Sequence, residues 1–208
     1  MAKRCELYLR LRADTLPPAS ELDAIIGETR AAALLITGPT APAAADDLGP
    51  LISLAQGQNL AVLIEEDIPL AKRLDADGVH LRARNGAASE ARRLLGDNKS
   101  VGVSCVLSRH EAMVMAEEGA DYIAFGEIGG PGRAAAEPLA EMIRWWDELF
   151  ETPCVAWVWG EDEEVHIESL VRAGADFLAI DAGPGDPAGR LSRIRSILDS
   201  VAAGGALS

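Results

Sequence analysis

The sequence lacks a positive net charge and a long apolar run. Its 19 Lys and Arg residues stand against 33 Asp and Glu residues, which gives a formal net charge of −14. This balance argues against nucleic acid and anionic lipid as partners, because both are bound by clustered basic residues. No apolar run approaches the ~20 residues that a membrane-spanning helix requires. No long apolar stretch follows the first basic residues either, so we expect neither a membrane span nor a secretion signal.

The sequence has three cysteines, and their spacing does not suggest disulfide pairs. Cys5, Cys105 and Cys154 are far apart in the chain, odd in number, and each lies in an apolar run. This pattern predicts buried reduced thiols and excludes a disulfide framework or a zinc site. We therefore expect a cytoplasmic protein.

What the sequence does contain is typical of one globular domain. Of the 208 residues, 49% are hydrophobic and 25% are charged, which excludes a disordered chain. Eight short and nearly continuous apolar runs predict parallel strands that are buried on both faces. These runs are Leu7–Leu11, Ala33–Thr37, Ala61–Ile64, Gly78–Leu81, Val101–Val106, Tyr122–Gly126, Cys154–Trp159 and Phe177–Asp181.

Amphipathic stretches alternate with these runs and predict helices. Ser20 and Ser108 are predicted N-caps of the first and fifth helices. The other predicted helices are Asp46–Gln56, Leu70–Leu74, Ala87–Leu95, Ala134–Phe150, Asp162–Ala173 and Pro187–Ala203.

A short unit recurs before three of the predicted strands. The segments 76–79, 119–123 and 174–178 each end a helix, turn on small residues and an aspartate, and enter a strand. This recurrence indicates repeated strand–helix units within one sheet. The eight strands, each followed by a helix, predict a single (β/α)8 barrel over residues 1–203, with a flexible tail over 204–208. An open, doubly wound sheet is the alternative.

The middle of the chain resembles a known family. The string Ala76-Asp77-Gly78-Val79-His80-Leu81 is similar to the fourth strand of the thiamine-phosphate synthase and thiazole tautomerase family. Two further segments, 101–126 and 153–176, follow in the family's order and spacing. The resemblance covers about residues 60–183 well and the N-terminal third weakly.

The resemblance implies a compact (β/α)8 barrel and a transferase reaction. Synthase members join hydroxymethylpyrimidine diphosphate to a thiazole phosphate and release pyrophosphate with Mg²⁺, whereas tautomerase members aromatise the thiazole. A small phosphorylated or heteroaromatic ligand is therefore implied. Ser104 matches the family's serine, but the histidine that a tautomerase has two residues later is Val106 here.

Other positions depart from the family pattern. The Gln-x-Arg-x-Lys motif that ends the second strand is absent from Leu34–Gly38. The two metal-ligand positions carry Glu66 and Asn85, which we take as candidate Mg²⁺ ligands. The diphosphate loop after the sixth strand retains a single cation, Arg133. The glycine pair after the seventh strand is Val158 and Trp159.

The sites of such barrels lie at the carboxyl ends of the strands. Ser104 and His80 are the candidate catalytic residues, since an imidazole at a strand end is suited to acid–base chemistry near neutral pH. A buried structural histidine is the alternative for His80. The remaining strand ends are rich in carboxylates, which predicts an acidic mouth: Glu65, Glu66, Asp67, Glu127, Glu161 and Asp181. Solvated loop charges and helix-capping acids are the alternative for these groups.

A glycine-rich loop precedes the sixth predicted helix. Backbone N–H groups of such loops cradle phosphate, although plain turn geometry explains the glycines as well. Trp157 and Trp159 lie on the same side of the seventh strand, facing either the mouth or the helix layer. The candidate substrate-binding residues are Gly129, Gly130, Gly132, Arg133, Trp157 and Trp159.

Three functions remain open from the sequence. The first is a divergent synthase that acts with Glu66 on Mg²⁺ and Arg133 on phosphate. The second is a degenerate paralogue that binds a ligand or regulates without turnover. The third is a different metal-dependent activity at an acidic barrel mouth. The pair Trp145-Trp146 also suggests a homodimer contact, with capping of the barrel edge as the alternative.

Overall fold

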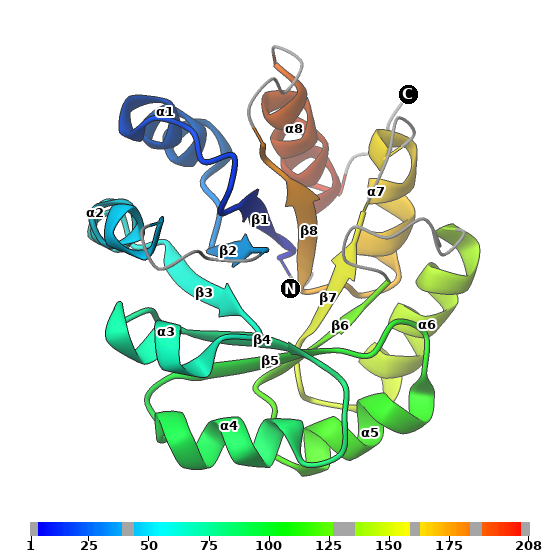
Figure 1. Ribbon diagram of the computed structural model, residues 1–208. Helices are drawn as coiled ribbons and strands as arrows, with labels where there is room; N and C mark the ends of the chain where they lie inside the picture. The colour runs from blue at the N-terminus through cyan, green and yellow to red at the C-terminus, as the bar shows by residue number, and fades with distance from the viewer. Residues whose placement is uncertain (1–3, 39–43, 127–135, 159–162, 184–188, 205–208) are drawn as a thin grey trace.

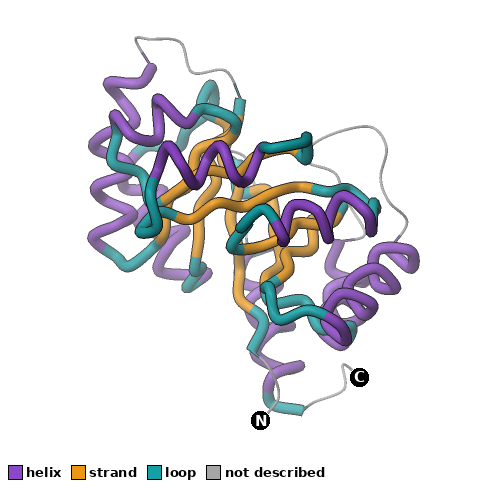
Figure 2. The backbone as a smooth tube through the Cα atoms, turned by 90° about the horizontal axis from the view of Figure 1, so that it is seen from below, coloured by secondary structure: helices purple, strands orange, loops and turns teal. Residues whose placement is uncertain are grey.

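The structure is a computed structural model that describes residues 4–38, 44–126, 136–158, 163–183 and 189–204. Its strands form a closed parallel barrel in the order β1 to β8, and the helices surround them (Figures 1 and 2). The barrel confirms the prediction and excludes the open sheet. Within the described residues, no helix combines the length and apolar character needed to cross a membrane.

Each predicted strand is present. The strands are β1 (Glu6–Arg12), β2 (Ala33–Thr37), β3 (Ala61–Glu65), β4 (Gly78–Arg82), β5 (Ser100–Ser104), β6 (Tyr122–Phe125), β7 (Cys154–Trp157) and β8 (Phe177–Asp181). The helices are α1 (Ala19–Thr29), α2 (Ala44–Gly57), α3 (Ile68–Arg73), α4 (Ala87–Leu95), α5 (Arg109–Glu117), α6 (Ala136–Leu149), α7 (Glu163–Arg172) and α8 (Arg190–Ala202).

Alternate residues of every strand face the two sides of the barrel wall. On β1, Leu7, Leu9 and Leu11 are fully buried in the layer between strands and helices. Tyr8 packs on the inner side with Leu35, Leu63, Val155 and Trp157. The inner side of β1 therefore also receives Arg10 and Arg12, because strand side chains alternate with a period of two.

The recurring aspartates are structural clasps at the amino ends of the strands. Asp77, Asp121 and Asp176 each precede a strand, and each carboxylate accepts the backbone N–H of a residue on the preceding strand: Val62 at 2.7 Å, Val101 at 2.7 Å and Cys154 at 2.8 Å. Each aspartate N–H also donates to the carbonyl of that same residue. Each aspartate thus satisfies both the backbone N–H and the backbone carbonyl of one residue on the preceding strand. The same need at each strand pair explains why the unit recurs.

Two local predictions differ from the structure. The first helix begins at Ala19 with Pro18 as its N-cap, so Ser20 lies inside the helix and does not cap it. Ser108 does cap α5, where its hydroxyl accepts the Glu111 N–H. The run Val101–Val106 is shorter as a strand, because Val106 adopts a positive φ of 49° and turns the chain away.

The two tryptophans of α6 differ in burial. Trp146 is 1% exposed, stacks on Phe150 and donates its indole N–H to the Thr152 carbonyl at 2.7 Å. Trp145 is half-buried, and the Arg109 guanidinium lies 4.8 Å from its ring centroid. A homodimer through this face stays a prediction. The three cysteines are buried and free, as the sequence predicts.

Candidate functional site at the barrel mouth

The carboxyl ends of the strands bring together residues that are distant in the sequence. Register pairs Arg12 with Thr37, Glu65 with His80, and Arg82 with Ser104. The inner side of this end therefore carries arginines as well as carboxylates.

His80 lies inside the barrel, below the mouth. Its Nε2 is 3.1 Å from the Ser104 hydroxyl, and its Nδ1 is 2.8 Å from the Tyr122 hydroxyl. The Tyr122 hydroxyl is in turn hydrogen-bonded to the Tyr8 hydroxyl at 2.8 Å. These four side chains form a continuous chain of hydrogen bonds, which we call the relay: Tyr8, Tyr122, His80 and Ser104.

Burial fixes the protonation states within the relay. His80 is fully buried, and this burial lowers its pKa from 6.5 to about 3, so the ring is neutral near pH 7. Burial also raises the pKa of Tyr8 and of Tyr122, which keeps both phenols protonated. The environment of His80 favours a positioning role through Ser104 over direct proton exchange with a substrate; its predicted catalytic role stays a prediction.

Trp157 faces the barrel interior and not the helix layer. Its ring centroid is 5.9 Å from that of His80 and 6.0 Å from that of Tyr8. Only 2% of the residue is exposed, so little ring surface remains for stacking on a ligand. Trp157 closes the barrel beneath the mouth, and the space at the end of β7 is filled to that depth.

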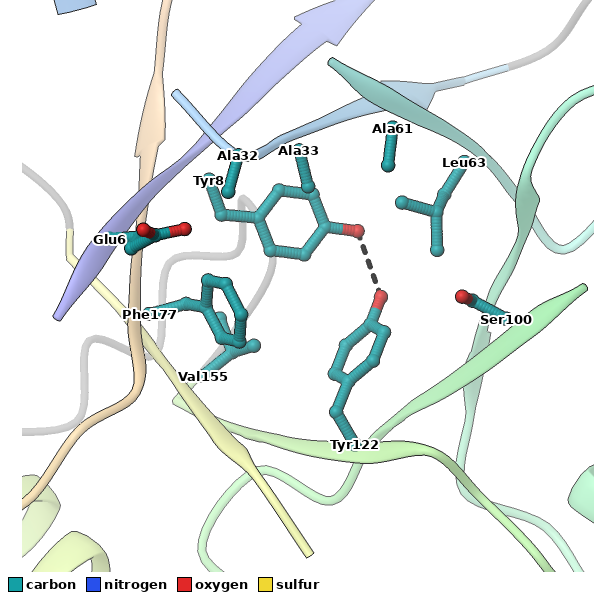
Figure 3. Close-up of a pocket in the computed structure, with 10 residues that line it drawn as sticks. All are labelled: Glu6, Tyr8, Ala32, Ala33, Ala61, Leu63, Ser100, Tyr122, Val155 and Phe177. Atoms are coloured by element: carbon teal, nitrogen blue, oxygen red, sulfur yellow. Dashed lines mark hydrogen bonds between the residues drawn. The ribbon is translucent and has the colours of Figure 1, made fainter. Parts of the chain in front are cut away.

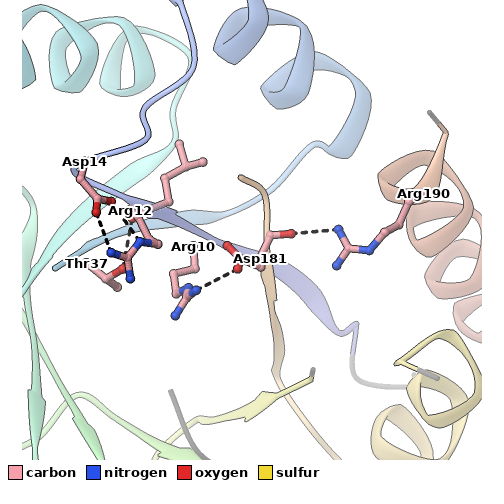
Figure 4. A network of polar contacts seen from close by, with 7 residues as sticks. Arg10, Arg12, Asp14, Thr37, Asp181 and Arg190 are labelled. Carbon is pink, nitrogen blue, oxygen red and sulfur yellow. Dashed lines mark hydrogen bonds and ion pairs between the residues drawn. The ribbon is translucent and has the colours of Figure 1, made fainter. Parts of the chain in front are cut away.

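Two arginines that the sequence did not indicate as site residues lie at the β1–β8 side of the mouth, where both contact Asp181. Arg10 is 7% exposed and donates from Nη2 to the Asp181 carboxylate at 2.8 Å. Arg190, at the start of α8, donates to the Asp181 backbone carbonyl at 2.9 Å (Figure 4). The period-two alternation of Tyr8, Arg10 and Arg12 is the sequence signal that places Arg10 and Arg12 on the inner side. The sequence carries no such signal for Arg190, which lies on α8.

Two further arginines lie at the strand ends of the mouth, and one of them is beside the β2 end that lacks the family's basic residues. Arg12 is paired with Asp14 and lies next to Thr37, the last residue of β2 (Figure 4). Arg82 ends β4, and its side chain is 72% exposed. Its Nη2 atom lies 4.0 Å from the carboxylate of Glu65, which ends β3. The mouth is therefore of mixed charge, in contrast to the acidic mouth predicted from the strand ends.

The carboxylates of the β3 end have different roles. Asp67 caps α3 by accepting the Leu70 N–H at 2.8 Å, as the helix-capping alternative proposed. Glu65 accepts the Gly38 N–H at 3.1 Å. Glu66 is exposed and accepts the backbone N–H of Arg82.

Glu66 and Asn85 carry oxygen donors of the kind that Mg²⁺ prefers, and the magnesium site stays a prediction. Both residues are exposed and follow adjacent strands, β3 and β4. Mg²⁺ is commonly held by one or two protein oxygens together with substrate phosphates. Among the described residues, no cluster of three His, Cys, Asp or Glu side chains forms a fuller cage. These two residues would therefore hold the ion only together with a phosphorylated ligand.

Several predicted residues lie outside the described residues. They are Gly129, Gly130, Gly132, Arg133 and Trp159, together with the carboxylates Glu127 and Glu161. The assignment of these residues to substrate binding stays a prediction.

Comparison with known proteins identifies the family. The model of the family described as thiamine monophosphate synthase matches residues 39–182. The thiamine-phosphate synthase of Erythrobacter litoralis is 42% identical over 135 residues, which cover 63% of this chain and 62% of that protein. The thiamine-phosphate synthase of Rhodospirillum centenum is 40% identical over 153 residues, covering 70% and 72%. The match thus spans less than two thirds of the Erythrobacter protein.

A solved structure supports the fold across almost the whole chain. The thiamine phosphate pyrophosphorylase from Pyrococcus furiosus superposes with a TM-score of 0.77 at 22% identity, covering 96% of this chain and 98% of that one. At this identity the likeness concerns the fold alone. The family match and the sequence relatives together carry the assignment: the chain belongs to the thiamine monophosphate synthase family.

Proposed function

We propose that this protein is a thiamine-phosphate synthase that joins hydroxymethylpyrimidine diphosphate to thiazole phosphate. The observation that supports the proposal most strongly is its 40% identity to a synthase over 70% of the chain. In such a reaction a bond forms from the thiazole to the methylene carbon of the pyrimidine while the bond from that carbon to the diphosphate breaks. Negative charge grows on the departing pyrophosphate, so the site must supply positive charge there.

The arginines of the mouth are suited to this task. The second strand ends in Thr37-Gly38 and lacks the family's basic pair, but Arg12 lies beside Thr37 on β1. Arg82 lies beside Ser104, and its exposed guanidinium is 4.0 Å from the Glu65 carboxylate. In the proposal, Arg82 on β4 and Arg12 on β1 bind the diphosphate, and Arg12 does so from the strand next to β2. Ser104, held by His80, adds a hydrogen bond.

The magnesium ion belongs to the proposal as well. When bound, Mg²⁺ neutralises diphosphate charge, and Glu66 and Asn85 would hold it together with the phosphate oxygens. Glu66 accepts the backbone N–H of Arg82, so the carboxylate that would hold the ion and the arginine that would bind the diphosphate are neighbours.

A synthase assay with both substrates and Mg²⁺ tests the proposal. We expect turnover, and we expect Arg82→Gln to lower kcat/KM about tenfold or more, because a charge-assisted contact to phosphate is lost. Arg93→Gln on the outer helix α4 is the matched control and should leave kcat/KM unchanged. Glu66→Gln should raise the Mg²⁺ concentration needed for half-maximal rate.

Two results would contradict the proposed synthase activity or its proposed diphosphate site. Absence of turnover at any Mg²⁺ concentration, together with calorimetric binding of a phosphorylated substrate, would identify a ligand-binding paralogue. Turnover that is insensitive to Arg82→Gln would show that the diphosphate is held elsewhere.

A further inference from the structure

A hollow lies at the amino ends of the strands, opposite the mouth. It has a volume of about 230 Å³ and is bounded largely by residues that begin strands (Figure 3). These residues are Glu6, Ala33, Ala61, Ser100, Tyr122 and Phe177. All six are only half-buried although they lie on the inner side of the barrel, so the hollow is accessible at this end.

Small side chains on neighbouring strands create the hollow. Barrel interiors are normally filled by layers of bulky branched residues. Here Ala33 is in register with Ala61, and Gly78 is in register with Ser100. Four consecutive strands, β2 to β5, thus begin without a bulky side chain, and the lowest layer of the barrel is incomplete on that side.

The lining of the hollow combines apolar walls with a carboxylate. Leu63, Val155 and Phe177 supply apolar surface, and the Tyr8 and Tyr122 hydroxyls meet at the inner end (Figure 3). Glu6 is the charged residue among those that line the described cavity, and none of these lining residues is basic. The aspartate clasps lie at the same end of the barrel, where Asp121 is also paired with Arg92 at 2.5 Å.

This chemistry selects a cation with an apolar body. An ammonium group is attracted by the Glu6 carboxylate and by the faces of aromatic rings such as Phe177. Among the lining residues an anion would meet no basic side chain. A cavity of about 150 Å³ accommodates benzene, so this hollow takes a molecule only a few non-hydrogen atoms larger.

We propose that the hollow at the amino end of the barrel is a second binding site, for a compact organic ammonium ion. Its carboxylate and apolar lining differ in chemistry from the arginine-bearing mouth. The inference does not depend on the synthase activity proposed above.

Benzylamine is the probe for this site. Calorimetry and ligand-observed NMR on the full chain at pH 7 should show saturable binding with a Kd of about 1 mM or tighter. Benzyl alcohol, which lacks the charge, should bind about tenfold more weakly, and phenylacetate should not bind measurably. Glu6→Gln should remove the preference for the amine over the alcohol.

Variants that fill the hollow test its location. Ala61→Leu should abolish benzylamine binding, whereas Ala24→Leu, at an exposed position of α1, should not change it. Ala33→Val adds less volume from the neighbouring strand and serves as the second filling variant. Circular dichroism and melting temperature establish that each variant is folded.

Three results would overturn the proposal. The first is the absence of saturable benzylamine binding to the wild-type protein. The second is unchanged binding in a folded Ala61→Leu or Ala33→Val variant. The third is equal weakening of the amine and the alcohol by Glu6→Gln, which would leave an apolar hollow without recognition of charge.

Discussion

The buried imidazole of His80 makes stability depend on pH in a defined way. The pKa of His80 is about 3 in the folded protein and 6.5 as the ordinary value. Between these values the unfolded chain binds a proton that the folded chain does not. The stability contributed by neutral His80 is therefore complete above pH 6.5 and is lost as the pH falls toward 3. From pH 7 to pH 5 the loss is about 2 kcal/mol.

Urea unfolding followed by tryptophan fluorescence at pH 7, 6 and 5 measures this loss. The other ionisable groups contribute in the same way to wild type and variant, so the comparison with His80→Gln isolates the imidazole. We expect the unfolding free energy of the wild type to fall by about 2 kcal/mol more than that of His80→Gln over this interval. The exposed His110 offers a matched control, and His110→Gln should behave as the wild type.

Equal pH dependence in the wild type and His80→Gln would refute the reasoning. It would mean that His80 ionises in the folded protein as readily as in the unfolded chain. The urea dependence of the free energy must also be equal in both proteins, since a changed slope would signal a different unfolded state.

The other predictions concern packing, clasps and thiols. A Cβ on Gly102 would stand 1.9 Å from the Tyr122 ring, so Gly102→Ala should displace that ring and lower the unfolding free energy by about 2–4 kcal/mol; a loss below about 0.5 kcal/mol would contradict the packing. Asp121→Ala removes a clasp and should cost about 1–3 kcal/mol in urea unfolding, against no measurable change for the exposed Asp97→Ala. The native protein should react with a thiol reagent only on unfolding, because its three cysteines are buried and burial raises the pKa of the Cys105 thiol; rapid labelling of the folded chain would disprove this.

The strands could be predicted because each is an apolar run of ordinary length, and the barrel because the strand–helix unit repeats eight times. The ends of the strands were harder to predict. Val106 is an apolar β-branched residue that continues the β5 pattern, yet its positive φ and its bridge to Gly126 turn the chain. Sequence alone does not reveal that backbone conformation.

Only part of the candidate site could be predicted from the sequence. His80 and Ser104 were predicted at strand ends and are joined by a hydrogen bond, while their catalytic role stays a prediction. The depth of His80 depends on how the barrel wall tilts, which one strand does not encode. Arg10 was missed because a strand that alternates leucine and arginine is typical of a surface strand. In a closed barrel its inner face becomes part of the mouth. The hollow was not predictable, since its small residues come from separate strands that only closure brings together.

The relay has a direction as well as a composition. A neutral imidazole carries a single N–H, so His80 donates either to Ser104 or to Tyr122, and accepts from the other. If Nε2 carries the proton, Ser104 accepts from the ring and its own hydrogen points elsewhere. If Nδ1 carries it, Ser104 donates inward and offers only lone pairs to the mouth. The orientation of a buried hydroxyl on Tyr8 is thereby tied to whether Ser104 acts as donor or acceptor, across the full interior of the barrel.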